Sequence, residues 1–130
     1  MCGTNEEFKA FVDDAHSRGI KIILDVAFNH TGETFWAFQD AMKNGPKSKY
    51  YDWYEWKQWP LPDVSSMNDY KPIDYYECWW GHGHMPNLNF DFDEANPSEN
   101  SIKDINLANP HWDVVNYVLD VGEYWISDMN

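Results

Sequence analysis

The sequence is poor in positive charge and in cysteine, and it contains no long apolar run. Its 130 residues include 9 Lys and Arg against 22 Asp and Glu, giving a formal net charge of -13. Nucleic acids and anionic membrane surfaces attract proteins through Lys and Arg, so this balance argues against both partners. No stretch approaches the ~20 apolar residues of a membrane span. Cys2 and Cys78 are too few for a disulfide framework, so the compartment stays open.

Aromatic residues are abundant. They make up 18% of the chain, which is 43% hydrophobic overall and contains eight Trp. Disordered chains lack aromatic residues, so the composition indicates a folded protein. The acidic balance suits a neutral ligand or a cation site, although most of the carboxylates are expected simply to keep an aromatic-rich surface soluble.

The N-terminal region has the pattern of a capped amphipathic helix. Thr4 and Glu7 have the spacing of a capping box, in which each side chain satisfies a free backbone donor of the other residue. Gly19 suits the left-handed position just past the helix end. Apolar residues recur at helical spacing between these signals: Phe8, Phe11, Val12 and Ala15.

The segment 20–28 follows directly and is apolar on both faces. Such a run predicts a strand buried within a parallel sheet. Its last residues turn polar, with Asp25, Asn29 and His30, and ligands of parallel α/β folds bind where strands end. A lone strand is unstable, and partner strands are not evident elsewhere in the sequence. The chain therefore looks like part of something larger.

The remaining sequence predicts one irregular region and two helices. Residues 32–90 combine aromatic residues with Pro and show little periodicity, apart from a short helix expected between Phe35 and Met42. Residues 91–109 are polar and loop-like. Asn109-Pro110 then has the character of an N-cap followed by Pro at the first helical position, and helical spacing continues to Ile126.

Two motifs carry a family resemblance. Asp25-Val-Ala-Phe-Asn-His30 resembles the first signature of the α-amylase family of glycoside hydrolases, which lies at the end of the third barrel strand. Met85-Pro-Asn-Leu-Asn89 is similar to a second signature, in the form found in the neopullulanase and cyclomaltodextrinase branch. The order of the motifs and of the flanking helices extends the resemblance over essentially the whole chain.

The resemblance implies an α/β fold. The chain would be a partial (β/α)₈ TIM barrel comprising helix 2, strand 3 and helix 3, with an irregular domain B inserted after the strand. Residues 1–31 would form the first barrel part, 32–90 domain B, and 91–130 the return to the barrel with helix 3. A complete barrel takes ~250 residues, so about half or less would be present.

The implied function is that of a retaining glycoside hydrolase acting on α-glucans such as starch, maltodextrin, cyclodextrin or pullulan. The family's nucleophile would lie just beyond Asn130 and its general acid further on, so we expect the chain to contribute the substrate cleft and no catalytic residue. The remainder of the barrel would be its structural partner. The alternatives are a carbohydrate-binding module without catalysis and an acidic calcium-binding domain, although the latter lacks a ligand-spacing motif.

The resemblance also implies roles for individual residues. His30 would hydrogen-bond the sugar at the cleavage subsite, and Asp25 would support the site by pairing with an Arg absent from this chain. On its own, the chain should leave Asp25 exposed or altered in protonation. Apart from the resemblance, Trp79 and Trp80 precede the second signature and are candidates to stack on sugar rings. For either residue, packing in the aromatic core of the irregular region is at least an equal expectation, and Trp80 is the better sugar candidate because it lies closer to the signature.

Whether the chain binds calcium as a cofactor is left open by the resemblance. Asn29 matches a residue that ligates calcium through its side-chain oxygen in many α-amylases. Asn87, however, stands where those proteins usually carry an Asp, which removes a charge and argues against calcium. His82-Gly83-His84 has no second ligand cluster and favours a sugar-contacting loop over a zinc site.

Overall fold

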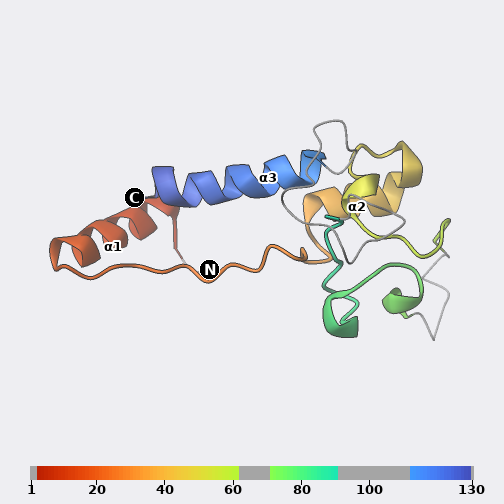
Figure 1. Ribbon diagram of the computed structural model, residues 1–130, viewed down its shortest axis with the longest axis horizontal. Helices are drawn as coiled ribbons and strands as arrows, with labels where there is room; N and C mark the ends of the chain where they lie inside the picture. Colours follow the sequence, from red (N-terminus) through yellow and green to blue (C-terminus); the bar gives the residue numbers. More distant parts are fainter. Residues whose placement is uncertain (1–2, 62–70, 91–111, 130) are drawn as a thin grey trace. The chain divides into compact units, whose positions relative to one another are not determined.

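A computed structural model describes residues 3–61, 71–90 and 112–129 (Figure 1). The chain divides into two compact units. Unit 1 comprises residues 1–26 and 116–130, and unit 2 comprises residues 27–115. The expected helix start at Asn109-Pro110 and the polar residues 91–109 lie outside the described part of the chain. The division into a first barrel part (1–31), domain B (32–90) and a return to the barrel (91–130) stays a prediction.

Unit 1 begins with helix α1 (Asn5–Ser17), which starts as the sequence predicts. The Glu7 amide donates to Thr4 Oγ1 at 3.2 Å, and the Thr4 amide donates to Glu7 Oε2 at 2.8 Å, which completes the capping box. Gly19 has φ +74°, the left-handed conformation expected just past the helix. The local signals at both ends of this helix are therefore confirmed.

The inner face of α1 packs against the C-terminal segment of the same unit. Val12 and Ala15 are buried, and the Phe8 ring meets Trp125 edge-on with centroids 5.4 Å apart. Asn5 Nδ2 donates to the Tyr124 hydroxyl at 2.7 Å. These contacts join residues more than one hundred positions apart into one unit.

The prediction of a buried strand over 20–28 is wrong for this chain. Residues 20–27 run as an extended trace (Figure 1) but pair with no strand in the described structure. Most of their apolar side chains are open to solvent, with Ile23 92% and Ile20 54% exposed, whereas Ile22 is half-buried. The physical reason is that sequence pattern fixes the extended backbone, whereas burial needs neighbouring strands, which the described residues do not supply.

Helix α2 (Trp36–Asn44) opens the regular part of unit 2 and confirms the short helix expected there. In the described part of the chain it is followed by four single 3₁₀ turns, η1 (Gly45–Lys47), η2 (Tyr51–Trp53), η4 (Pro72–Asp74) and η5 (Trp79–Gly81). In place of a sheet, the described residues of this unit form isolated antiparallel bridges. The irregularity predicted for this region is therefore what the structure shows.

Aromatic rings build the core of unit 2. Phe38 of α2 is almost fully buried, as are Tyr54 and Tyr76. The Phe38 ring stacks on Trp56 at 5.9 Å and meets Tyr54 and Tyr76 edge-on at 4.9 and 5.0 Å. Such pairs add about 0.5–1.5 kcal/mol each beyond the burial of area, which allows a unit with little regular structure to hold a fixed shape.

Helix α3 (Trp112–Glu123) confirms the C-terminal helix predicted from spacing. Its last turn widens into a π-helical turn, η8 (Tyr124–Asp128), which the sequence pattern does not indicate. Among the helices of the described residues, none is both long enough and apolar enough to cross a membrane.

Candidate functional site

The two motif segments meet in unit 2, although more than fifty residues separate them in the sequence. The Leu88 amide donates to the Asn29 carbonyl at 3.0 Å, and the Thr31 amide donates to the Pro86 carbonyl at 3.0 Å. His30 and Asn87 form an antiparallel bridge between these bonds. The polar end of the first motif is therefore held against the middle of the second by backbone hydrogen bonds.

The imidazole of His30 lies flat against an indole. The His30 and Trp79 rings are 4.9 Å apart between centroids, and their planes differ by only 10°. On the edge of the imidazole, Nδ1 lies 3.2 Å from Asn29 Oδ1. The His30 side chain is only partly exposed, so both its plane and one of its nitrogens are engaged.

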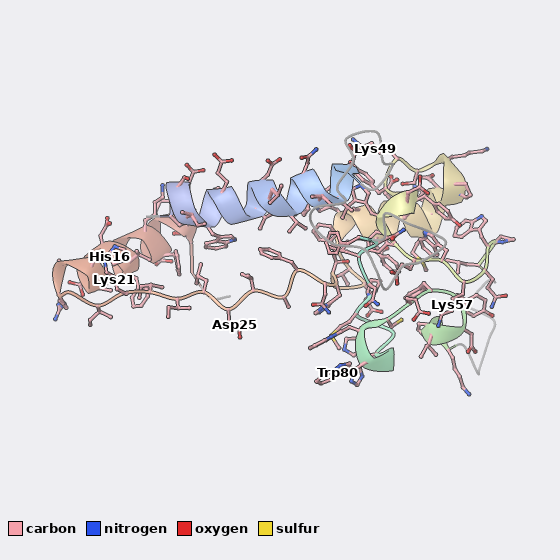
Figure 2. The ribbon with its side chains drawn as sticks, in the orientation of Figure 1. His16, Lys21, Asp25, Lys49, Lys57 and Trp80 are labelled. Atoms are coloured by element: carbon pink, nitrogen blue, oxygen red, sulfur yellow. The ribbon has the colours of Figure 1, made fainter. Side chains whose placement is uncertain are left out.

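The stack continues outward to Trp80. The Trp79 and Trp80 rings lie 4.7 Å apart with planes 19° from parallel, so Trp79 stacks on both His30 and Trp80. Trp80 is 81% exposed and projects from the η5 turn at the edge of its unit (Figure 2). The order His30, Trp79, Trp80 thus runs from the junction of the motifs to solvent.

Trp80 also has an unusual backbone. Its φ is +50°, and among the described residues it is the one non-glycine with a positive φ. Bulky side chains disfavour this region, so it persists only where the surroundings enforce it. Here the Gly81 amide donates to the Cys78 carbonyl at 3.1 Å and the Trp79 amide to the Met85 carbonyl at 2.9 Å, which closes the turn around Trp80.

Asp25 lies in the other unit, on the extended segment. Its side chain is exposed, one of the two states expected for the chain on its own (Figure 2). Of the residues predicted from the sequence, the structure brings together Asn29, His30, Trp79 and Trp80.

The described residues do not fit a calcium ion. Calcium takes six to eight oxygen ligands, usually with carboxylates among them. Here the two oxygens in question are neutral amides: Asn29 Oδ1 faces the His30 ring, and Asn87 Oδ1 is buried without a hydrogen-bond partner in the described structure. Within residues 3–61, 71–90 and 112–129, no group of three or more His, Cys, Asp or Glu side chains could hold a metal. We therefore derive no step through calcium.

The sequence did not reveal the ring stack or the buried oxygen of Asn87. Adjacent tryptophans before the second motif were the visible signal, but their faces are set by the turn at Trp80 and by pairing with the first motif. Thr31 belongs to the polar cluster expected at the end of the first motif, but its contact is not predicted: its hydroxyl lies 3.2 Å from the Tyr54 hydroxyl and ties the first motif to the aromatic core.

Comparisons with known proteins agree on one family. A family model described as "Alpha amylase, catalytic domain" matches residues 1–130. A cyclomaltodextrinase from a Bacillus species is 35% identical over 126 residues, which make up 97% of this chain and 18% of that protein. Neopullulanase 2 from Thermoactinomyces vulgaris is 48% identical over 61 residues, or 47% of this chain and 10% of that protein.

The fold comparison gives the same result. The native form of a debranching enzyme from Nostoc punctiforme superposes with a TM-score of 0.71 at 32% identity, and the match covers 97% of this chain and 21% of that one. This chain therefore spans about a fifth or less of the length of each of these proteins.

Proposed function

This chain belongs to the α-amylase catalytic-domain family, and on that basis we propose that it forms part of the sugar-binding cleft of a retaining glycoside hydrolase acting on α-glucans. The observation that carries the proposal is the pairing of the two motif segments through Asn29 and Leu88. That pairing presents one histidine and one exposed tryptophan on the same stack.

The proposed division of labour follows from the chemistry. In a retaining glycosidase, one carboxylate attacks the anomeric carbon while a carboxylic acid protonates the departing oxygen. We assign neither role to this chain and place both carboxylates in sequence beyond Asn130. The chain would supply binding and orientation, which lower the barrier by holding the substrate in a reactive geometry.

His30 and Trp80 are the proposed substrate contacts. The Nε2 atom of His30 has no hydrogen-bond partner in the described structure and can bond a sugar hydroxyl. The exposed face of Trp80 can cover the apolar face of a glucose ring. Trp79 already stacks on both His30 and Trp80, which leaves less of its surface for the sugar. Asp25 would act indirectly, through an Arg outside this chain.

The finer architecture is part of the same proposal. Residues 1–31 would contribute helix 2 and strand 3 of a (β/α)₈ barrel, residues 32–90 domain B, and residues 91–130 helix 3. Support comes from the helices α1 and α3, the extended run between α1 and the first motif, and the irregular aromatic unit that follows. The remaining barrel strands would cover the exposed apolar side chains of residues 20–26.

Sugar binding can be tested with matched tryptophan variants. We expect Trp80→Ala to weaken maltooligosaccharide binding several-fold, equivalent to about 1 kcal/mol of stacking. Trp36→Ala is the control because Trp36 is also exposed, at 49%, and lies in the same unit. Isothermal titration calorimetry or NMR titration measures both. Equal losses in the two variants, or no loss in either, would contradict the proposal.

Hydrolysis by the purified 130-residue chain is the second test. We expect no release of glucose or maltose from maltooligosaccharides, because the nucleophile and the general acid are proposed to lie elsewhere. Product release that persists through rigorous purification and falls in Trp80→Ala would show that the activity belongs to this chain and that the catalytic carboxylates are within it.

A further inference from the structure

We propose that Trp79 and Asn29 are positioning residues that fix the plane and the tautomer of His30, so that its Nε2 accepts a hydrogen bond from a sugar hydroxyl. The claim that the hydrogen-bond donor is a sugar hydroxyl rests on the proposed function. The fixed plane and tautomer rest on the geometry of unit 2 alone.

The plane of His30 is fixed by stacking. The Trp79 indole lies 4.9 Å from the imidazole and within 10° of parallel. Trp79 cannot tilt freely, since it also stacks on Trp80 at 4.7 Å and its amide is bonded to the Met85 carbonyl. Rotation of the imidazole out of this plane would break the parallel contact, so the indole fixes the plane in which Nε2 lies. The contact between Nδ1 and Asn29 Oδ1 selects one of the two flipped orientations within that plane.

The tautomer of His30 is fixed by Asn29. An amide oxygen can only accept a hydrogen bond, so the contact between His30 Nδ1 and Asn29 Oδ1 requires the proton on Nδ1. In a neutral imidazole the other nitrogen then carries a lone pair and no proton. The backbone of Asn29 is held in turn, because its carbonyl accepts from the Leu88 amide of the second motif.

A consequence for specificity follows from this arrangement. A lone pair on Nε2 requires a donor from the ligand, and a free sugar hydroxyl supplies one. A methyl ether at the same position has no proton to donate and would lose the bond. The site therefore selects an α-glucan with an unmodified hydroxyl facing His30.

The imidazole nitrogens can be observed directly by ¹⁵N-detected correlation NMR on the 130-residue chain at about pH 9, above the ordinary titration range of histidine. We expect a protonated, pyrrole-type Nδ1 and a bare, pyridine-type Nε2 for His30. Asn29→Ala should shift His30 towards the Nε2-protonated form, whereas Asn29→Asp keeps an acceptor and should preserve the original tautomer. An Nε2-protonated His30 in the unsubstituted chain would overturn the inference.

The stack has its own signature in the ring-proton shifts of His30. The indole should move them upfield of their positions in the urea-unfolded chain. Trp79→Leu should abolish this shift, and Trp79→Phe should restore most of it. Trp36→Leu is the control, since Trp36 lies in the same unit and its ring packs on Phe35, Tyr50 and Trp53, and backbone amide spectra check that each variant folds. Unchanged ring-proton shifts in folded Trp79→Leu would refute the role of Trp79, and an unfolded Trp79→Leu leaves the unsubstituted chain's upfield shift to decide.

The two proposals can fail separately. If maltooligosaccharides do not bind while His30 keeps the expected tautomer and upfield shift, the proposed function fails and the positioning of His30 stands. If sugar binds but the tautomer is reversed, the positioning inference fails and the sugar site stands.

Discussion

At the scale of single residues, Cys78 shows how burial changes a titrating group. Its side chain is only 6% exposed, and burial raises the pKa of the thiol above its ordinary value of 9.0; nearby Glu77 raises it further and Lys57 opposes the shift. The unfolded chain therefore loses this proton at a lower pH than the folded chain. The stability linked to Cys78 is intact below about pH 9 and is lost as pH rises through the folded pKa.

We predict that alkaline destabilisation and slow alkylation both trace to Cys78. In a Cys2→Ser background, iodoacetamide should modify the folded chain more slowly than the urea-unfolded chain, because the thiolate is the nucleophile. Urea unfolding at pH 8 and at pH 10 should show a decline in stability that is smaller in Cys78→Ala. Identical declines in both chains would show that other groups dominate.

Gly45 is a second position where a single added atom, a Cβ, would disturb the packing. Its φ is +55°, and a Cβ built there would lie 2.2 Å from Trp59 Cζ2. Gly81 has a similar φ of +76°, but the nearest atom to its Cβ would be the flexible end of Ile73 at 3.3 Å. Both positions favour glycine because their φ angles are positive, and only at Gly45 would an added Cβ also clash with an indole.

We predict that Gly45→Ala destabilises unit 2 more than Gly81→Ala does. A positive φ costs an Ala about 1–3 kcal/mol at either site, and at Gly45 the ψ of -138° lies in a region that only glycine adopts readily. Forcing Trp59 aside should add about 1–3 kcal/mol at Gly45, as overpacking does elsewhere. Chemical unfolding followed by Trp fluorescence measures both. Equal losses would mean that Trp59 moves at little cost.

At the scale of elements, helix ends are encoded locally and can be tested locally. Thr4→Ala should cost α1 about 1 kcal/mol, because the Glu7 amide loses its side-chain acceptor. Thr4→Ser keeps a hydroxyl and should retain most of the stability. Far-UV circular dichroism during urea unfolding compares the two variants, and an Ala variant as stable as the Ser variant would argue against the cap.

The elements differ in how far sequence could predict them. The ends of α1 depend on Thr4, Glu7 and Gly19, all within one or two turns, so they could be read from the sequence. The segment 20–27 could not, because its burial depends on strands that no nearby residue specifies. For the candidate site, the motifs indicated His30 and Trp80. The stack between them depends on the backbone of η5 and on a pairing across more than fifty residues, which no local pattern contains.

At the scale of the whole molecule, the exposure of residues 20–26 changes which observation supports the family assignment. This segment was expected to be buried in a parallel sheet, and on its burial alone the family assignment would have failed. The match over residues 1–130 carries the assignment instead. An apolar run that is extended but uncovered is what a barrel segment would show without its neighbours, and this can be tested.

We predict that Ile23→Lys hardly changes the stability of the 130-residue chain but strongly destabilises a longer protein that completes the barrel. In the 130-residue chain, Ile23 is 92% exposed, so the variant should change stability by less than about 0.5 kcal/mol and should reduce self-association, since Lys discourages edge pairing. In a longer protein that completes the barrel, the same Lys would be buried and strongly destabilising. Thermal unfolding and sedimentation of both proteins measure this. A neutral effect in the longer protein would contradict the proposed barrel.

The extended segment also makes the chain vulnerable to cleavage. Residues 21–27 form no backbone hydrogen bond with any described residue, and proteases bind their substrates as just such unpaired, stretched peptides. Lys21, at the start of the segment, is exposed (Figure 2) and offers trypsin its preferred residue. Brief digestion should therefore nick the chain there early, while the ring-packed interior of unit 2 survives. Slow cutting at Lys21 would mean that something in solution already covers it.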